Sequence, residues 1–368
     1  MRSPEAKVFK FAALSSVKHG YVHRGVAAHP RFDPVVVADD ASEGEWAHER
    51  NQKMAEELDV PYVRDVEKAI SEYGAEVAVI SSQAERHCDL AVRAADAGLH
   101  VVQDKPMSTS VSECDRVVEA TDRNGVKFMM WNRNFMPSLV QTREAIERGD
   151  IGLPYAIHVD FYFASDAGPP KGSRGPGDPP IDWNEYQKSA HELGRDGGVG
   201  SEPMGELKIE GIYPLAYIRM LIGVDVKRVF ARTASHFHQV NVDNGIEDLA
   251  SVTLEMDHGI VGALTIGRVG SGGHPDGSMI KISILGSKGT LVVNESKPEV
   301  AISYRGQTKG PYHRKVGNEG DFLLMEGFAQ AIDTDGPTAL DARGGRAIAA
   351  TVEAALESAR TGKPVNLK

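Results

Sequence analysis

VVQDKPM, at Val101–Met107, is the stretch from which the fold of this chain can be predicted. Residues 99–102 form a short apolar run, and such a run predicts a buried parallel strand. The charged pair Asp104-Lys105 follows this strand directly, at the edge where open α/β sheets bind their ligands. Because a proline disfavours helical geometry at the residue before it, Pro106 is expected to hold Lys105 extended at the strand tip.

The residues before this stretch favour a binding role over a solvated turn, which is the alternative that Asp-Lys-Pro alone leaves open. A strand at Val77–Ile80 and a helix at Glu85–Ala97 precede the strand, so the three elements form one βαβ unit. This arrangement resembles the Gfo/Idh/MocA family of nicotinamide-dependent oxidoreductases, in which the comparable strand ends in Glu-Lys-Pro. Asp104 takes the place of that Glu. The resemblance implies that Lys105 is catalytic, that it contacts both cofactor and substrate, and that Asp104 belongs to the cofactor site.

Length and composition indicate two globular domains without nucleic-acid or membrane partners. The chain has 368 residues, which is more than one hydrophobic core usually supports. Its net charge of -11 argues against nucleic acid or an anionic membrane as the main partner. There is no apolar run of membrane-spanning length and no signal-peptide layout, and the two cysteines do not make a disulfide framework. We therefore expect a cytoplasmic protein.

The turn Ser15–Gly20 follows the first expected strand, at Val8–Leu14. A dinucleotide-binding turn reads Gly-x-Gly-x-x-Gly, because glycines allow a tight turn and the close approach of a pyrophosphate. The alignment that the family resemblance implies makes Gly20 the third glycine. Ser15 and Val17 then occupy the first two glycine positions.

This departure changes what the turn is expected to do. Ser15 can occupy a tight turn and donate its hydroxyl to a phosphate, whereas the branched Val17 is expected to push the phosphates outward. Lys18 and His19 supply positive charge that offsets the loss. The alternative is a degraded site that binds the cofactor weakly or not at all.

The second expected strand, at Val35–Ala38, ends in Asp39-Asp40. An acidic side chain at this position accepts hydrogen bonds from the adenosine ribose hydroxyls and repels a 2′-phosphate. Asp39 is the better placed of the two, so we expect NAD rather than NADP. A charge or cap at the start of the next helix is the alternative role, and both roles can hold.

Further site residues are implied by the family resemblance at the turns after the fourth and sixth expected strands. Ser81 and Gln83 take the positions that pass beneath the nicotinamide ribose, while Ser82 stands where proline is usual. His87 matches a family histidine, and structural hydrogen bonding is its alternative role. Arg133 lies at the switch into the second domain, where it is expected to face the substrate.

A second informative stretch is GELKIEGIY at Gly205–Tyr213. It resembles the family pattern Leu-x-Asp-x-Gly-x-His in the glucose–fructose oxidoreductase branch, where tyrosine takes the last position. The resemblance implies that Tyr213 is catalytic, and a core aromatic is the alternative. Ile209 stands where the family has an aspartate. Three charged residues are candidates to replace that aspartate: Glu206, Lys208 and Glu210. The residues expected to contact substrate are Lys105, Arg133, Glu206, Ile209 and Tyr213.

We expect an α/β N-terminal Rossmann domain and an α+β C-terminal domain with a large, mostly antiparallel open sheet. The predicted boundary divides the chain into residues 1–134 and 135–368, with the last helix, at 341–360, packing back on the first domain. The family usually forms dimers or tetramers through the second sheet, so a homodimer or homotetramer is expected. The alternating runs that predict this sheet are Val226–Thr233, Ala250–Glu255, Gly259–Ile266, Ile280–Leu285 and Gly289–Val293.

The loops carry weaker signals. Ala167–Pro180 is dense in glycine and proline and is expected at the pocket mouth or at a subunit contact. His236 and His238 are better explained as solvent-facing histidines than as metal ligands, because no third ligand has a recognisable spacing, and no metal is expected. His274, in the loop Gly270–Gly277, has substrate contact as an alternative role.

The expected reaction is hydride transfer between a secondary alcohol of a sugar, glycoside or cyclitol and a nicotinamide. A phenol has a pKa near ~10, so Tyr213 needs a neighbouring cation to act as a base near neutrality, and Lys105 is that cation. Two alternatives stay open. One is an epimerase, glycosidase or lyase that recycles a tightly bound NAD, and the other is a sensor or scaffold without activity.

Overall fold

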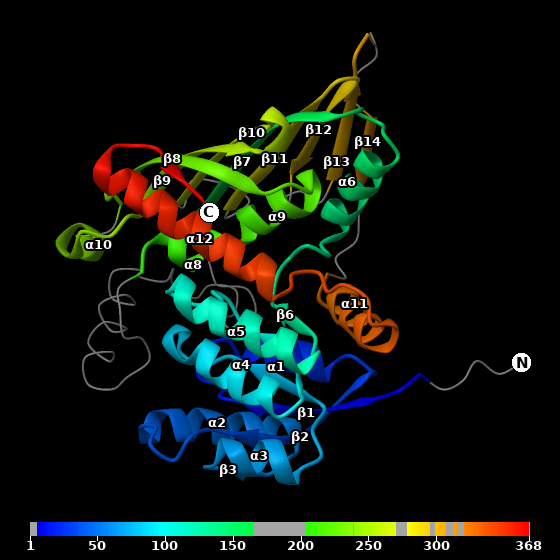
Figure 1. Ribbon diagram of the computed structural model, residues 1–368, viewed down its shortest axis with the longest axis vertical. Coiled ribbons are helices and arrows are strands. Elements are labelled where there is room, and N and C mark those ends of the chain that lie inside the picture. Colours follow the sequence, from blue (N-terminus) through cyan, green and yellow to red (C-terminus); the bar gives the residue numbers. More distant parts are fainter. Residues whose placement is uncertain are drawn as a thin grey trace, which may run out of the picture. The chain divides into compact units, whose positions relative to one another are not determined.

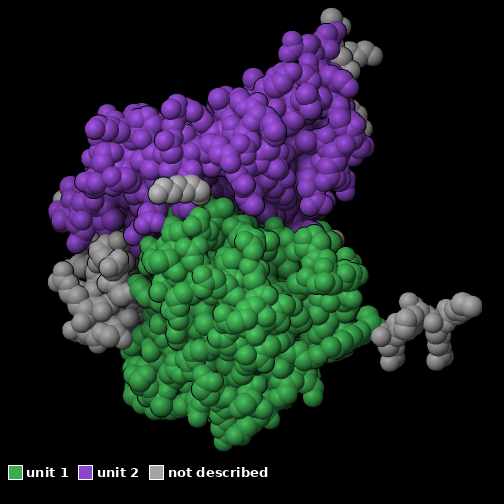
Figure 2. All heavy atoms as spheres, in the orientation of Figure 1, with its two compact units in different colours: residues 1–133, 190–202, 321–349 green, residues 134–189, 203–320, 350–368 purple. Residues whose placement is uncertain are grey.

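The computed structural model describes residues 6–164, 204–237, 239–269, 278–294, 299–306, 312–315 and 320–367 (Figure 1). These residues form two compact units, coloured separately in Figure 2. Unit 1 contains the described residues of 1–133 and 321–349, and unit 2 those of 134–320 and 350–367 apart from the gaps. The Gly/Pro-rich loop 167–180, His238, and the loop 270–277 with His274 lie outside the described residues.

The sheet of unit 1 has the strand order β3-β2-β1-β4-β5-β6, and every neighbouring pair is parallel. Its direction of winding reverses between β1 and β4, and open α/β sheets bind ligands at that point, outside the carboxyl ends of the strands. The expected Rossmann fold of the first domain is confirmed. The strands are β1 (Phe9–Leu14), β2 (Phe32–Ala38), β3 (Tyr62–Val63), β4 (Val77–Ile80), β5 (His100–Gln103) and β6 (Phe128–Met130).

The helices of unit 1 cover both faces of this sheet (Figure 1). Local chemistry sets several of their ends: the Asp65 side chain accepts a hydrogen bond from the Lys68 N–H, and Gly125 ends a helix at φ +64°. The single helix expected at 85–97 is instead a 3₁₀ turn followed by an α-helix, because the Arg86 N–H bonds to the Gln83 carbonyl three residues back (2.9 Å). The elements are α1 (Gly20–Ala27), α2 (Glu45–Leu58), α3 (Val66–Glu72), η1 (Ala84–Arg86), α4 (His87–Asp96), α5 (Val111–Asn124), α11 (Gly320–Thr334) and the start of α12 (Ala342–Thr361).

The start of α12 belongs to unit 1. The Arg346 guanidinium donates to the Asp115 carboxylate of α5 (2.8 Å), and a Cβ on Gly345 would lie 2.6 Å from the Met107 sulfur. Just before the helix, the Leu340 carbonyl accepts the Met130 N–H (2.9 Å) and so extends the edge of β6. These contacts tie residues near the chain's end to the strand and helix that follow Lys105.

His23 of α1 makes the stability of unit 1 depend on pH. It is fully buried, its Nε2 lies 3.2 Å from the Val79 carbonyl oxygen, and burial lowers its pKa to about 4. The unfolded chain, with a histidine pKa near ~6.5, binds more protons between these values, so the free energy of unfolding falls as pH falls through this window. We expect His23 to account for about 3 kcal/mol of this loss between neutral pH and about pH 4.

Urea unfolding at a series of pH values measures this effect. His23→Gln keeps an N–H donor near Val79 and removes the titrating group, so its stability should depend less steeply on pH. The pH dependence should not vanish, because burial also lowers the pKa of His29 and of His87. An unchanged slope in the variant would show that His23 is not the group that titrates.

Unit 2 is built on a nine-stranded sheet with the order β14-β13-β12-β11-β7-β10-β9-β8-β15. Only the pair β7–β10 is parallel among the described pairs, so the expected mostly antiparallel sheet is confirmed. The strands are β7 (Pro154–Ala164), β8 (Val226–Ala234), β9 (Leu249–Met256), β10 (Val261–Val269), β11 (Ser278–Gly286), β12 (Gly289–Asn294), β13 (Glu299–Tyr304), β14 (Tyr312–Lys315) and β15 (Val365–Asn366).

One face of this sheet is packed and the other is open. Along β9 the residues alternate between buried and exposed, with Val252 and Leu254 on the buried face and Thr253 on the exposed face. The packed face lies against α9, which contacts β7 and α6. The helices of unit 2 are α6 (Pro137–Glu147), α8 (Glu206–Ile209), α9 (Ile212–Ile222), α10 (Gln239–Asn244) and the end of α12. None of the helices in the described residues is long and apolar enough to cross a bilayer.

Candidate active site

The turn between β1 and α1 has the backbone of a glycine turn although it begins with serine. Ser15 has φ +58°, the left-handed region in which a side chain costs about 1–2 kcal/mol. Its hydroxyl and that of Ser16 are buried, and neither has a hydrogen-bond partner among the described residues. Two orphaned donors at the switch point suit a ligand rich in oxygen atoms, as a dinucleotide pyrophosphate is.

Val17, in the same turn, is packed in the core of unit 1. Its side chain is 1% exposed, so the branched group is not presented to a ligand that approaches from solvent. Its carbonyl oxygen accepts a hydrogen bond from the Arg50 guanidinium of α2 (2.6 Å). The expectation that Val17 pushes the phosphates outward stays a prediction, and the structure adds that the valine is packed and that its backbone carbonyl binds the cation Arg50.

Replacing Ser15 by glycine is expected to stabilise the cofactor-free protein by about 1 kcal/mol. Glycine adopts a positive φ without strain and removes a buried hydroxyl that lacks a partner, and these gains exceed its extra entropy in the unfolded chain. Ser15→Ala is the matched control, because alanine removes the same hydroxyl and keeps the strain. Urea unfolding of the three proteins measures the difference. A glycine variant less stable than the alanine variant would contradict the assignment of strain to this position.

A buried carboxylate joins this turn to the tips of β4 and β5. Asp104 Oδ2 lies 2.6 Å from His19 Nδ1 and accepts the Ser81 hydroxyl (2.8 Å), while its Oδ1 accepts the Lys105 N–H (2.7 Å). Burial acts to raise the pKa of Asp104, but His19, His87 and Lys105 lower it overall. Asp104 is therefore a fixed anion that holds His19 and the backbone of Lys105 in place.

Ser81, directly after β4, is hydrogen-bonded to the turn between β1 and α1. Its hydroxyl accepts the His19 N–H (2.9 Å) and its carbonyl oxygen accepts the Lys18 N–H (3.0 Å), while its own N–H donates to the Ser15 carbonyl (3.0 Å). The proposed phosphate turn, the end of β4 and the Asp104 side chain thus form one hydrogen-bonded group. The sequence predicted these residues separately, and the structure brings them together.

Cations gather around this group. The pKa of Lys18 is lowered by burial first, and then by the positive charges of Lys105 and Arg50, although Glu85 and Asp104 oppose the shift. Like charges near one another in a partly buried site favour an anionic ligand that neutralises them. Arg50 was missed in the sequence because it lies in the middle of a polar helix, where nothing separates it from ordinary surface residues. The residues present therefore fit a dinucleotide, whose pyrophosphate Lys18 and Arg50 would hold.

His87 and Gln83 serve the turn after β4. His87 is buried, and its ring nitrogens lie 2.7 Å from the Pro106 carbonyl oxygen and 3.0 Å from that of Ser82. These contacts support the structural alternative for His87, since they tie the Lys105-Pro106 loop to the end of β4. Gln83 donates from Nε2 to the Glu43 carboxylate (3.1 Å), so its side chain points toward the end of β2.

In unit 2, Tyr213 is the second residue of α9. It is 6% exposed, and its ring stacks on Phe161 of β7 with centroids 6.2 Å apart. A Cβ at Gly211 would lie 2.2 Å from the Leu207 carbonyl oxygen, so only glycine fits between α8 and α9. The spacing Gly-x-Tyr thus has a packing reason: it lets the chain turn tightly just before the tyrosine.

Arg268 of β10 binds the two glutamates that flank Ile209. Its Nε donates to Glu206 (2.6 Å) and its Nη2 to Glu210 (3.3 Å), and both carboxylates are largely buried. Burial acts to lower the pKa of Arg268, but these two charges raise it overall. Sequence reasoning missed Arg268, because an arginine that ends an alternating strand looks like any surface residue. The two glutamates thus share one fixed cation, which offsets half of their combined charge.

The remaining site residues divide between the units. Lys105 is 7% exposed at the tip of β5 in unit 1, whereas Glu206, Ile209 and Tyr213 belong to unit 2. Arg133 lies in unit 1, where its charge opposes the burial that raises the pKa of Asp321. None of the described residues forms a group of three or more His, Cys, Asp or Glu side chains that could hold a metal ion.

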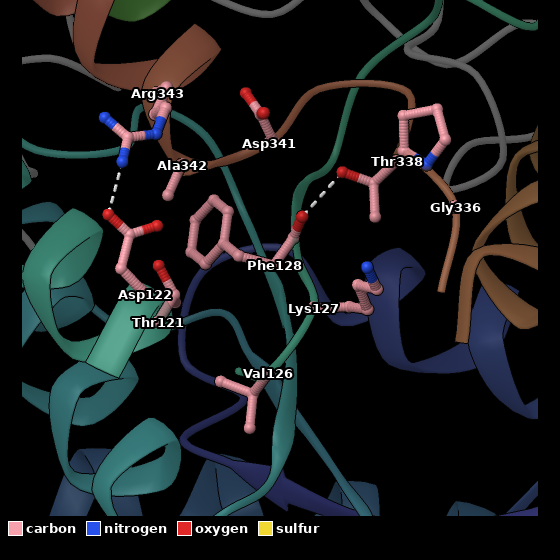
Figure 3. A pocket seen from close by; sticks show the side chains of 11 residues that line it. Thr121, Asp122, Val126, Lys127, Phe128, Gly336, Thr338, Asp341, Ala342 and Arg343 are labelled. Atoms are coloured by element: carbon pink, nitrogen blue, oxygen red, sulfur yellow. Dashed lines mark hydrogen bonds and ion pairs between the residues drawn. The ribbon is translucent and has the colours of Figure 1, made fainter. Parts of the chain in front are cut away.

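A separate hollow of about 190 Å³ lies at the opposite, amino-terminal end of β6 (Figure 3). Its charged side chains are engaged: Arg343 pairs with Asp122, and Lys127 pairs with Asp335 outside the lining. The Thr338 hydroxyl donates to the Phe128 carbonyl oxygen (2.7 Å). Because these groups already satisfy one another, this hollow is not the candidate active site.

A Rossmann sheet whose switch point has cations and hydroxyl groups unpartnered among the described residues indicates a dinucleotide-binding protein. The chain belongs to the Gfo/Idh/MocA oxidoreductase family: residues 20–131 match its NAD-binding Rossmann fold and residues 143–367 match its C-terminal alpha/beta domain. The family expectation from the sequence is confirmed, and so is NAD as the cofactor.

Curated relatives span most of the chain at low identity. The myo-inositol 2-dehydrogenase of Thermotoga maritima is 24% identical over 256 residues, which cover 69% of this chain and 67% of the relative. The inositol 2-dehydrogenase of Rhizobium meliloti is 24% identical over 319 residues, covering 83% and 84%. A solved structure of levoglucosan dehydrogenase with NADH has a TM-score of 0.78 at 20% identity and covers 98% of this chain and 100% of that chain. This last likeness shows a shared fold.

Proposed function

We propose that this enzyme transfers a hydride between a secondary alcohol of a cyclitol, sugar or glycoside and NAD. The observation that carries the proposal is the fixed position of Lys105, whose backbone is held by the buried Asp104 beside the cation-lined turn. Two relatives named as inositol 2-dehydrogenases and a fold relative named levoglucosan dehydrogenase support the substrate class. All three names refer to dehydrogenases of ring compounds that carry hydroxyl groups.

The proposed roles of the residues follow from the chemistry of their side chains. When bound, NAD supplies the hydride acceptor for the carbon that carries the alcohol. Tyr213 accepts the alcohol proton, and the Lys105 ammonium donates a hydrogen bond to the reacting oxygen and favours the charged form of the phenol. Ser15, Lys18, His19 and Asp39 bind the cofactor, and Arg133 and Glu206 line the substrate site.

We also propose that the open face of the unit 2 sheet joins two or more copies of the chain. Phe230, Val261 and Leu285 share this face and are 36%, 48% and 43% exposed. Large apolar side chains on an uncovered sheet favour association. Light scattering coupled to size-exclusion chromatography measures the mass, and a monomer at micromolar concentration would contradict this assignment.

The free, buried Cys88 and Cys114 support a cytoplasmic location.

An NAD reduction screen over inositols, sugars and anhydrosugars tests the reaction. We expect at least one of them to give net NADH in solution, seen by its absorbance. Nucleotide released from denatured protein without net NADH in any reaction would contradict a dehydrogenase and favour a recycled cofactor. Failure of the purified protein to bind NADH would contradict both the dehydrogenase and the enzyme with a recycled cofactor.

A further inference from the structure

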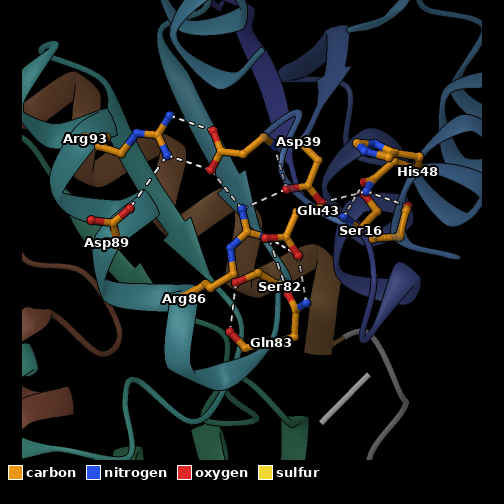
Figure 4. Close-up of polar contacts among 12 residues, drawn as sticks. Ser16, Asp39, Glu43, His48, Ser82, Gln83, Arg86, Asp89 and Arg93 are labelled. Carbon is orange, nitrogen blue, oxygen red and sulfur yellow. Dashed lines mark hydrogen bonds and ion pairs between the residues drawn. The ribbon is translucent and has the colours of Figure 1, made fainter. Parts of the chain in front are cut away.

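Arg86 stands among three carboxylates at the carboxyl end of β2 (Figure 4). Its Nη2 lies 2.9 Å from Asp39 Oδ1 and 2.9 Å from Asp40 Oδ2, and its Nη1 lies 3.2 Å from Glu43. The side chain comes from η1, beyond β4, and reaches back to the tip of β2. Its side chain is 21% exposed.

Asp39 marks the position of the adenosine ribose in the proposed cofactor site. Its carboxylate is buried, and it accepts hydrogen bonds from the Asn51 amide (2.8 Å) and the Asp40 N–H (2.9 Å) in addition to Arg86. An acidic side chain at the end of β2 accepts the ribose 2′-hydroxyl, whereas a nearby arginine accommodates a 2′-phosphate. Both kinds of group are present here, 2.9 Å apart.

The charge balance of the cluster disfavours a phosphate as it stands. Asp39, Asp40 and Glu43 face Arg86, while a second guanidinium, Arg93, binds Asp40 through Nη1 and Nη2 (2.8 and 2.9 Å). Arg93 also pairs with Glu67 (2.7 Å) and Asp89 (3.6 Å), so five carboxylates meet two guanidinium groups. Burial acts to lower the pKa of Arg86, but the carboxylates, Asp39 first, raise it overall. The guanidinium stays charged and is occupied by carboxylates.

We propose that Arg86 determines how strongly this enzyme prefers NAD to NADP. Its guanidinium is a phosphate-binding group placed at the ribose 2′ position and held by Asp39, Asp40 and Glu43. The carboxylates repel a 2′-phosphate, and Arg86 limits that repulsion, so the preference reflects the balance between them. The proposal rests on the ribose role proposed above for Asp39.

The alternative is that Arg86 only fixes the turn after β4, where its Nη1 lies 3.4 Å from the Gln83 side chain. A purely structural role would weaken the binding of both cofactors by similar factors. A role in selectivity changes the ratio of their dissociation constants. The ratio is therefore the quantity to measure.

The experiment measures Kd for NADH and NADPH on the whole protein by fluorescence titration. Two competing fragments, 5′-AMP and 2′,5′-ADP, isolate the effect of the 2′-phosphate. In Arg86→Gln we expect the ratio of Kd for NADPH to Kd for NADH to rise about tenfold or more, because the phosphate then faces uncompensated carboxylates. In Asp39→Asn we expect the ratio to fall about tenfold or more, because the guanidinium is released toward the phosphate.

Two further variants test the pairing. Adding Arg86→Gln to Asp39→Asn should cancel the gain in NADPH binding. Arg93→Gln is the matched control, since it removes a guanidinium from Asp40 but not from Asp39, and its ratio should change less than about threefold. Thermal unfolding midpoints confirm that each variant is folded.

The outcomes separate the two proposals. If Asp39→Asn alters neither NADH affinity nor the ratio, the ribose role of Asp39 is wrong, and the Arg86 inference falls with it. If Asp39→Asn shifts the ratio but Arg86→Gln does not, only the inference about Arg86 is overturned. A ratio that changes equally in Arg93→Gln and Arg86→Gln would also overturn it, because the effect would then be general electrostatics.

Discussion

Replacing Lys105 by methionine is expected to lower kcat by about 10³-fold or more while NADH affinity falls less than about tenfold. Methionine keeps the length and apolar stem of a side chain that is 7% exposed, and it removes only the ammonium. Asp104 should stay paired, since the substitution leaves its partners His19 and Ser81, 2.6 and 2.8 Å from its carboxylate in the wild type, unchanged. The local backbone should therefore survive, and the loss should fall on the chemical step.

The measurement is steady-state turnover with the substrate found in the NAD screen, together with fluorescence titration of NADH. Lys18→Met is the matched control, because Lys18 is a second cation of the same candidate site. Its proposed role is to bind the pyrophosphate. This variant should raise KM for NAD and leave kcat within about tenfold. Wild-type turnover in Lys105→Met would exclude the lysine from catalysis, whatever happens to cofactor binding.

Much of the fold was predictable because hydrophobic runs decide it. The parallel strands of unit 1 are short, apolar and buried on both faces, so runs such as Val77–Ile80 show clearly in the sequence. The weaker elements were not predicted: β13 and β14 at the edge of the unit 2 sheet, and the two-residue strand β15, which pairs with β8. Such edge strands depend on a neighbour for their existence, and the sequence does not show that neighbour.

The site was predictable where a residue follows a strand and not where it reaches across the fold. Asp104, Lys105 and Ser15 lie directly after β5 or β1, so their place at the switch point follows from the order of the strands. Arg86 meets Asp39 across 47 positions, and Arg268 meets Glu206 across 62. Such pairs follow from tertiary geometry alone.

Some sequence expectations gain a physical reason from the structure. Serine at position 15 was expected to fit a tight turn, and its φ of +58° shows that it adopts the glycine conformation itself. The missing aspartate at Ile209 was expected to need a replacement. Two of the candidates for that replacement, Glu206 and Glu210, both pair with Arg268 in the structure. Neither carboxylate is therefore an isolated charge.

Replacing Tyr213 by phenylalanine is expected to lower kcat at neutral pH by about 10²–10⁴-fold. The ring stacks on Phe161 at 6.2 Å between centroids, and phenylalanine keeps that packing while it removes the hydroxyl. Affinity for NADH should change little, because the residues proposed to bind the cofactor lie in unit 1 and Tyr213 lies in unit 2. The loss should therefore appear in kcat and in kcat/KM to a similar extent.

The pH profile of kcat/KM separates a proton-transfer role from a packing role. If the phenol is the base, the rise of kcat/KM with pH in the wild type reports its ionisation, and this limb should disappear in Tyr213→Phe. Tyr217→Phe is the matched control: it lies one turn later on α9, is fully buried, and its ring contacts the same Phe161 at 6.3 Å. It also loses a hydroxyl, yet its kcat should stay within about threefold of the wild type. Because the two variants differ in position and not in chemistry, equal losses of kcat would assign the effect to the packing of α9. A wild-type pH profile of kcat/KM in Tyr213→Phe would show that Tyr213 is not the base, and Lys105 would then have no proposed partner.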